Sequence, residues 1–369
     1  MSSVGARGKE PRSIPHRLGV GMVLAVLVLG LAASPASAAL LGWAVGEGGT
    51  ILHTSNGGGT WGPQVSGTGS DLFGAEFVDA LNGWAVGESR IIRHTSNGGA
   101  TWGPQASGTG VPLIGVEFVD ALNGWAVGGD SVIVHTSDGG GTWGPQFKNP
   151  DFLLHGVEFV DALSGWAVGE SGTILHTSNG GGTGGGTWAP QVSGTTFGLN
   201  GVEFVDALNG WAMGEGGTIL HTIDGGGTWG PQVSGTGLPL LGVEFVDALN
   251  GWAVGGFGGT STILHTSNGG TTWTPQASGT SAPLLGVEFV DALNGWAVGE
   301  GGTILHTSNG GATWAPQASG TTALLRGVEF VSTPSQAIPE PGTLTLVGFG
   351  LVSCFAAARL KRKHGLRQR

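Results

Sequence analysis

The chain has 369 residues, and about a quarter of them are glycine or proline. Hydrophobic residues make up 39% and charged residues 11%, which is too apolar for a disordered chain, so the glycines predict tight turns between short strands. One cysteine excludes an intramolecular disulfide and a thiolate zinc site. Residues 39–338 hold four basic residues against 23 acidic ones, which argues against nucleic acid as a partner.

Residues 1–38 have the layout of a secretory signal peptide. A basic region that ends at Arg17 is followed by an apolar stretch over residues 18–33 and by the small residues Ala36, Ser37 and Ala38. This order predicts cleavage by signal peptidase after Ala38, with an uncleaved membrane anchor as the alternative.

The chain ends in a second segment, 339–369, after a linker at 332–338. Pro339, Glu340 and Pro341 precede an apolar run at 344–358 and a basic cluster at 359–363. The run is short for a full membrane span of about 20 residues, and the basic cluster is expected on the cytoplasmic side. The arrangement resembles the PEP-CTERM sorting signal of Gram-negative bacteria. That resemblance implies processing by an exosortase, transient anchoring through 344–358, and a place at the cell surface or in the exopolysaccharide matrix. A permanent C-terminal anchor is the alternative.

The sequence between these ends repeats with a period near 41 residues. A Gly-Trp pair recurs seven times and a second Trp follows each pair, which accounts for all 14 tryptophans. Each unit has four short runs rich in Val, Ile, Phe and Trp, separated by Asn-Gly or Gly-Gly turns. Four strands per unit at this period predict an all-β fold with the antiparallel blades of a β-propeller.

The ends of the repeat array predict how the ring closes. The first repeat begins at Gly42 and lacks the Val-Glu-Phe-Val run, whereas the last repeat is followed by a spare copy at 327–331. We expect this strand to complete the N-terminal blade, which leaves no open sheet edge. Residues 39–331 are therefore predicted to form one seven-bladed propeller.

Each repeat also carries a turn motif. Residues 136–143 match the Asp-box pattern Ser/Thr-x-Asp-x-Gly-x-Thr-Trp, with an acidic or amide side chain to cap the turn and the Trp behind it. An insertion is expected to disturb the motif in repeat 4. The seven turn residues are Asn56, Asn97, Asp138, Asn179, Asp224, Asn268 and Asn309.

The Gly-Trp-Ala-Val-Gly-Glu and Gly-Thr-Ile-Leu-His-Thr segments together with the Asp-box (BNR) turns resemble the Ycf48-like repeat family, named for photosystem II assembly factors. The resemblance covers 42–331. It implies a propeller, and it implies membrane-protein partners that are bound partly through a basic patch.

Candidate enzymatic and metal sites have little support. A sialidase needs a tyrosine nucleophile, and the chain has no tyrosine. Seven glutamates and seven histidines recur once per repeat, so each is expected to be structural rather than part of a catalytic pair or metal site, with each histidine bonded to a neighbouring turn. No cofactor is expected. The glutamates are Glu76, Glu117, Glu158, Glu203, Glu244, Glu288 and Glu329, and the histidines are His53, His94, His135, His176, His221, His265 and His306.

Function is sought where the repeat is broken. Arg90, Arg93 and Arg326 are predicted to form one basic spot on an acidic disc. The connection at 147–155 replaces the usual Ser-Gly-Thr loop and brings in Lys148, Phe152 and His155. The sequence thus predicts a non-catalytic exported propeller that binds an envelope protein. The alternatives are a glycan-binding or structural matrix protein, favoured if tryptophans are exposed in a groove, and more weakly an exported glycoside hydrolase.

Overall fold

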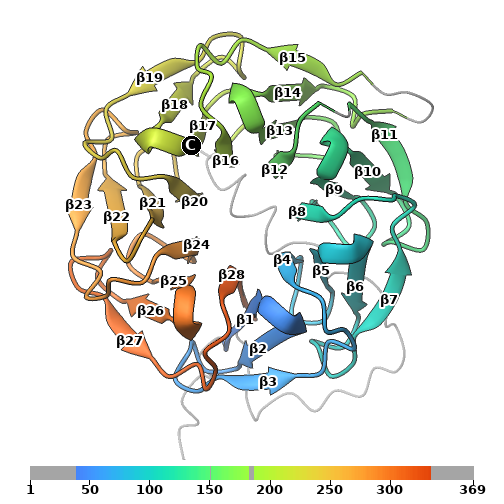
Figure 1. Cartoon of the computed structure of the whole chain (residues 1–369), viewed down its shortest axis with the longest axis horizontal. Helices are drawn as coiled ribbons and strands as arrows, with labels where there is room; N and C mark the ends of the chain where they lie inside the picture. Colours follow the sequence, from blue (N-terminus) through green and yellow to red (C-terminus); the bar gives the residue numbers. More distant parts are fainter. Residues whose placement is uncertain (1–38, 150, 183–186, 334–369) are drawn as a thin grey trace, which may run out of the picture. The chain divides into compact units, whose positions relative to one another are not determined.

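The computed structural model describes residues 39–149, 151–182 and 187–333. These residues form seven four-stranded antiparallel sheets, the blades, arranged as a ring (Figure 1). Within each blade the strands follow one another from the axis outward, and only blade 1 takes a strand from the far end of the sequence. The predicted seven-bladed propeller is therefore confirmed.

The strands have the following bounds. Blade 1 contains β28 (Leu325–Ser332), β1 (Leu40–Gly46), β2 (Thr50–Thr54) and β3 (Gly62–Gln64). Blade 2 contains β4 (Leu72–Phe77), β5 (Gly83–Gly87), β6 (Ile91–Thr95) and β7 (Gly103–Ala106). Blade 3 contains β8 (Leu113–Phe118), β9 (Gly124–Gly128), β10 (Ile133–Thr136) and β11 (Gly144–Phe147). Blade 4 contains β12 (Leu154–Phe159), β13 (Gly165–Gly169), β14 (Ile174–Thr177) and β15 (Ala189–Gln191).

The remaining blades follow the same order. Blade 5 contains β16 (Leu199–Phe204), β17 (Gly210–Gly214), β18 (Ile219–Thr222) and β19 (Gly230–Gln232). Blade 6 contains β20 (Leu240–Phe245), β21 (Gly251–Gly256), β22 (Ser261–Thr266) and β23 (Thr274–Gln276). Blade 7 contains β24 (Leu284–Phe289), β25 (Gly295–Gly299), β26 (Ile304–Thr307) and β27 (Ala315–Gln317).

Six blades join their second and third strands through a short 3-10 turn. These turns are η1 (Glu47–Gly49), η2 (Glu88–Arg90), η3 (Gly129–Ser131), η4 (Glu170–Gly172), η5 (Glu215–Gly217) and η6 (Glu300–Gly302). In the described part of the chain, none of the helical segments has the length and apolar character that a membrane span requires.

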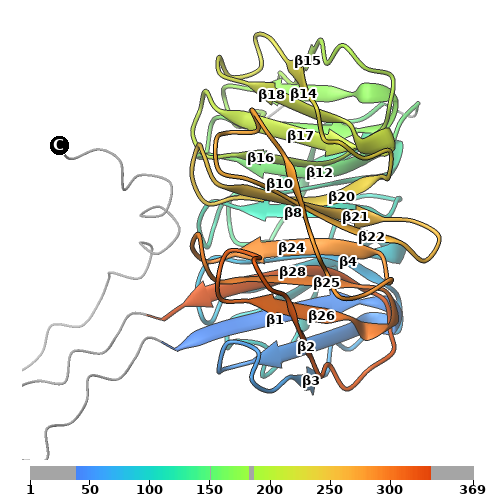
Figure 2. The ribbon, with the colours of Figure 1, turned by 90° about the vertical axis from the view of Figure 1, so that its left-hand side faces the viewer.

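The ring closes as the sequence predicts. β28 pairs antiparallel with β1 in a register that sets Trp43 opposite Glu329. Beyond the paired strands, the Ala39 amide donates to Thr333 Oγ1 at 3.0 Å, and the Thr333 amide donates to the Ala39 carbonyl at 2.9 Å. Figure 2 shows β1 beginning and β28 ending on the same side of the ring.

The hydrophobic core lies between blades. In the cluster between blades 1 and 2, Trp43 stacks on Phe77 with ring centroids 3.6 Å apart, and Phe77 meets Trp102 edge-on at 5.8 Å. The same trio recurs at all seven blade junctions. Edge-on contacts are a favoured arrangement of aromatic rings, and each ring buries a large apolar surface, so one Trp-Phe-Trp set per repeat holds each blade to its neighbour.

A glutamine on the outer strand of each blade forms a polar link to the next blade. Gln64 Oε1 accepts from Trp102 Nε1 at 3.1 Å, and Gln64 Nε2 donates to the Gly98 carbonyl at 3.0 Å. Gly99 has a positive φ of 83°, and a Cβ there would overlap the Gln64 side chain, so glycine is required twice over at this position. The link from the outer Trp to the preceding glutamine occurs at every junction, including the closing one from Gln317 to Trp61.

Candidate binding face

The propeller has two unlike faces. The η face carries the 3-10 turns and the connections between blades, which are linked by hydrogen bonds such as that from the Glu88 amide to the Asp71 carbonyl at 2.9 Å (Figure 1). The Asp-box face carries the Asp-boxes and the turns from first to second strand, linked by bonds such as that from the Gly98 amide to the Leu81 carbonyl at 2.9 Å. All six residues predicted for partner binding belong to elements of the η face or strands that start there.

The three arginines are only partly brought together. Arg326 Nη2 lies 3.8 Å from Asp71 Oδ2, and Arg93 Nη2 donates to the Gly67 carbonyl at 2.7 Å, so both guanidinium groups contact the connection between β3 and β4. Arg90 is exposed in η2. Because the Asp71 carboxylate pairs with Arg326, the positive charge of the predicted basic spot is lower than that of three unpaired arginines.

The connection from β11 to β12 is fixed onto the η3 turn. Lys148 Nζ lies 3.3 Å from Asp130 Oδ2, and the Ser131 amide and hydroxyl both donate to the Phe152 carbonyl, at 2.7 and 2.9 Å. At the start of β12, His155 Nδ1 lies 3.1 Å from Asn200 Oδ1 on the next blade. Lys148 and His155 thus face different neighbours and do not form one cluster.

Arg326 and His155 belong to a larger set that the sequence reasoning did not identify. They occupy the same repeat position, the second residue of the innermost strand, where six different residue types occur among the seven blades. We call these residues the axial ring. Its members are Phe73, Ile114, His155, Asn200, Leu241, Leu285 and Arg326.

The axial ring is held together by contacts between neighbouring blades. The Arg326 guanidinium carbon lies 4.9 Å from the centre of the Phe73 ring, and Asn200 Nδ2 donates to the Leu240 carbonyl at 2.9 Å. The next residue of the strand is always glycine. A Cβ at Gly286 would lie 2.8 Å from the Arg326 carbonyl, so glycine lets the inner strands approach one another closely.

All seven axial-ring side chains are half-buried. Around the ring, a cation over an aromatic ring (Arg326 and Phe73) is followed by Ile114, by the polar His155–Asn200 pair, and by the apolar Leu241 and Leu285. Because the surrounding Leu-x-Gly-Val-Glu-Phe frame is nearly constant, this variation is not required by the fold. The signal was available in the sequence as one variable column beside an otherwise regular repeat.

The η turns of blades 2 and 3 carry backbone strain. Ser89, Arg90, Asp130 and Ser131 have positive φ values of 57°, 67°, 52° and 46°, where blade 1 has two glycines. A left-handed conformation costs a non-glycine residue about 1–2 kcal/mol. This cost falls on the same face as the axial ring.

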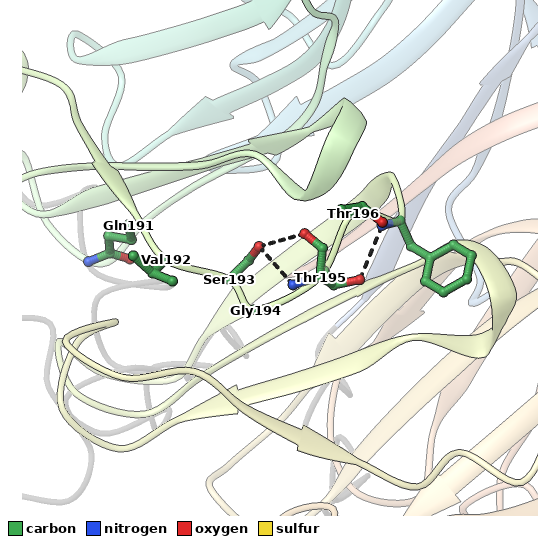
Figure 3. Close-up of a pocket in the computed structure, with 7 residues that line it drawn as sticks. Gln191, Val192, Ser193, Gly194, Thr195 and Thr196 are labelled. Atoms are coloured by element: carbon green, nitrogen blue, oxygen red, sulfur yellow. Dashed lines mark hydrogen bonds between the residues drawn. The ribbon is translucent and has the colours of Figure 1, made fainter.

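Further exposed side chains lie on the η face. Phe257 is 74% exposed at the tip of the β21–β22 hairpin, the one place in the described ring where the 3-10 turn is replaced. Phe197 is 53% exposed beside a shallow hollow of 580 Å³ lined by residues 191–197 (Figure 3). The lining is uncharged, and its Ser193 and Thr195 hydroxyls bond within the loop, so the hollow holds no catalytic pair.

The Asp-box turns are structural. In blade 3 the Asp138 carboxylate accepts from the Thr142 amide at 2.8 Å and from the hydroxyls of Thr136 and Thr142. The backbone hydrogen bond from Thr142 is the main reason that the pKa of Asp138 is lowered. In repeat 4, where the insertion is expected to disturb the motif, Asn179 Oδ1 accepts from Thr177 Oγ1 at 2.9 Å and Asn179 Nδ2 donates to Thr187 Oγ1 at 3.2 Å, while residues 183–186 lie outside the described residues.

The repeated histidines contact rings rather than turns. His53 lies opposite Trp43 in the sheet register, and their ring centroids are 5.0 Å apart. All seven histidines make this contact, where a hydrogen bond to a turn was expected, and burial lowers the pKa of each from 6.5. Within the described ranges no three His, Cys, Asp or Glu side chains are grouped closely enough to hold a metal.

The glutamates and tryptophans also belong to the blade junctions. Five of the seven repeated glutamates are buried and the other two, Glu203 and Glu244, are half-buried. Thirteen tryptophans are at most 8% exposed, and Trp61 is half-buried. The tryptophans therefore offer no exposed stacking platform.

Comparison with solved structures supports the fold. A structure described as YCF48 bound to D1 peptide is 21% identical, covers 75% of this chain and 93% of its own, and superposes with a TM-score of 0.60. YCF48 from Cyanidioschyzon merolae is 22% identical, with coverages of 68% and 86% and a TM-score of 0.54. A GH74 xyloglucanase from Xanthomonas campestris is 13% identical, with coverages of 80% and 52% and a TM-score of 0.60. No curated protein sequence matches the chain.

Two family models match the sequence. Residues 337–363 match the PEP-CTERM protein-sorting motif, the mark of exported proteins that an exosortase processes; Pro339, Glu340 and Pro341 lie outside the described residues. Overlapping matches at 64–151, 108–189, 146–239 and 232–318 are to the photosynthesis system II assembly factor YCF48 model. Because these matches span more than half of the chain, it belongs to the YCF48 repeat family.

Proposed function

We propose that this protein is an exported, non-catalytic propeller that binds a polypeptide of the cell envelope on its η face. The observation that carries the proposal is the axial ring: the positions where this regular chain departs from its own repeat adjoin one another on one face. The ring offers a cation, hydrogen-bonding groups and apolar side chains together, which suits a peptide with mixed chemistry.

The family supports a polypeptide as the ligand. A related propeller of the same family is described as bound to a peptide, and the chain covers most of that structure's length. The sorting motif implies an exported protein, which supports a partner outside the cytoplasm. In this proposal signal peptidase cuts after Ala38, and residues 344–358 hold the protein at the inner membrane until the exosortase acts.

The alternatives have weaker support. Glycan binding through stacked tryptophans is disfavoured because the tryptophans are core residues of the blade junctions. A glycoside hydrolase needs two carboxylates facing one cleft, whereas the repeated glutamates are distributed one per blade beside the junction tryptophans. The likeness to the xyloglucanase is one of fold alone.

The test is a pull-down with the purified mature protein. Two fractions of the producing cell are offered, detergent-solubilised envelope proteins and deproteinised exopolysaccharide. We expect an envelope protein to be retained, and to be lost with the double change Leu241→Asp and Leu285→Asp. The matched control is Val65→Asp with Val233→Asp; both valines are 85% exposed and follow outer strands on the same face.

Two results would overturn the proposal. Retention on polysaccharide alone would make the protein a matrix glycan binder. Binding to neither fraction would make it a passive surface protein. If the control variant loses the partner as fully as the axial-ring variant does, the η face acts only through its overall charge.

A further inference from the structure

Six exposed leucines mark the Asp-box face. Each stands in the turn between the first and second strand of its blade, in the repeat Asp-Ala-Leu-Asn, with Ser164 in place of the Asn in blade 4. Their exposed fractions lie between 55% and 57%, so the six side chains have equivalent environments. They are Leu81, Leu122, Leu163, Leu208, Leu249 and Leu293.

The backbone of each turn is fixed by hydrogen bonds. Asp79 Oδ1 accepts from the Leu81 and Asn82 amides, both at 2.7 Å, and the Leu81 carbonyl accepts from the Gly98 amide of the adjacent Asp-box at 2.9 Å. The other five turns make the same set of bonds. The leucines of a regular ring therefore stand at one height along its axis, as six apolar points in one plane.

The seventh position of this ring is where the described chain begins and ends. In blade 1 the Asp-box amide of Gly57 bonds to the carbonyl of Leu40, which is half-buried at the start of β1 rather than exposed in a turn, and Ala39 and Thr333 are hydrogen-bonded there. The sequence continues through ten residues, 334–343, to the apolar run at 344–358. Ten extended residues span at most about 35 Å. A chain inserted in a membrane by this run therefore holds the Asp-box face next to that membrane.

We propose that the Asp-box face docks on the lipid bilayer through its six leucines while the C-terminal segment is in place. A bilayer is the partner that meets coplanar apolar points around a whole ring at once, because it is flat and deformable. Interfacial binding grows with the apolar area inserted and with electrostatic attraction to the headgroups. Docking leaves the η face, with its axial ring, directed away from the membrane.

The charge of the face predicts which lipids it accepts. The six turn aspartates and the Asp-box residues Asp138 and Asp224 place eight carboxylates on these loops, and within the loops that the structure describes there is no Lys or Arg. Anionic headgroups are repelled by such a surface. The face is therefore expected to prefer zwitterionic bilayers. The turn aspartates are Asp79, Asp120, Asp161, Asp206, Asp247 and Asp291.

The test measures depth in the bilayer at single labelled sites of the full-length protein. An environment-sensitive fluorophore is attached to Cys354, the one native cysteine, which lies in the apolar run. In two further proteins Cys354→Ser removes that site and the label is placed at Leu122→Cys on the Asp-box face or at Val233→Cys on the η face. Vesicles of phosphatidylethanolamine and phosphatidylcholine carry bromine atoms on the lipid chains as quenchers.

We expect the label at position 122 to shift to the blue and to be quenched, and the label at position 233 to stay unquenched. Changing the other five leucines to serine is expected to abolish the quenching at 122 while Cys354 stays quenched. Replacing a third of the lipid by anionic phosphatidylglycerol is expected to weaken the quenching of the label at position 122. An unquenched label at 122 overturns the proposal whatever Cys354 reports. A blue shift at 122 that rises with protein concentration and needs no lipid overturns it in favour of self-association.

Discussion

Replacing Gln105 with alanine should measure what the polar link between blades contributes. Gln105 Oε1 accepts from Trp143 Nε1 at 3.2 Å, and its Nε2 donates to the Gly139 carbonyl at 3.0 Å, so the side chain joins β7 to the Asp-box of blade 3. The Gly139 carbonyl keeps a second donor, Trp84 Nε1 at 3.2 Å, but the Trp143 indole N–H lies in a side chain only 7% exposed.

The magnitude follows from these contacts. Leaving a buried donor without a partner costs about 1–3 kcal/mol, and the lost bond to Gly139 adds about 1 kcal/mol. We expect Gln105→Ala to lower the free energy of unfolding by about 2–4 kcal/mol. Urea unfolding followed by tryptophan fluorescence measures this loss of stability. The transition midpoint is expected to move to lower urea concentration while the dependence of the unfolding free energy on urea stays the same. Val233→Ala, at an exposed site, is the control and should change stability by less than about 0.5 kcal/mol.

A small effect of Gln105→Ala would refute this reasoning. If the loss is no greater than in the Val233→Ala control, water replaces the glutamine without penalty, and the aromatic contacts alone hold the blades together.

Three further outcomes are expected. Arg90→Gly should raise the free energy of unfolding by about 0.5–1 kcal/mol in urea titrations, because relief of the positive φ exceeds the entropy that glycine adds to the unfolded chain; destabilisation would mean that Arg90 makes a stabilising contact. Stability should fall as the pH drops below 6.5, since each repeated histidine has a lowered pKa in the folded state and the unfolded state therefore binds more protons; thermal midpoints that stay level from pH 7 to pH 5 would contradict this. Ending the chain before Leu325 removes β28 and leaves β1 as an open edge, so circular dichroism should show loss of the cooperative thermal transition, and an unchanged transition would contradict the role of closure.

The fold could be predicted because the same strand and turn pattern recurs in every repeat. Two tryptophans and a set of glycine turns per unit fixed the number of blades, and the spare strand at 327–331 fixed the closure. Two predictions were less successful, the histidine contacts and the basic spot, because they depend on strand register and on pairing between charged side chains. The ring contact of His53 with Trp43 follows from their being opposite each other in the sheet, and Asp71 lies beside Arg326 because of the packing of blades 1 and 2.

The axial ring escaped prediction for a geometrical reason. His155 and Asn200 are 45 residues apart, and only the convergence of inner strands at the axis makes them neighbours. A single repeat read by itself shows one unremarkable residue at this position. Its meaning appears when the seven residues, which include a cation, two hydrogen-bonding side chains and four apolar ones, lie next to one another on one face.

The claim that the η face binds a polypeptide is tested most directly by photocrosslinking in the producing cell. A benzophenone amino acid is placed at Leu241 of the axial ring and, in a second strain, at Leu81 on the Asp-box face. We expect a discrete protein adduct from position 241 and none from position 81. A protein adduct from position 81 alone, or only polysaccharide joined to position 241, would contradict it.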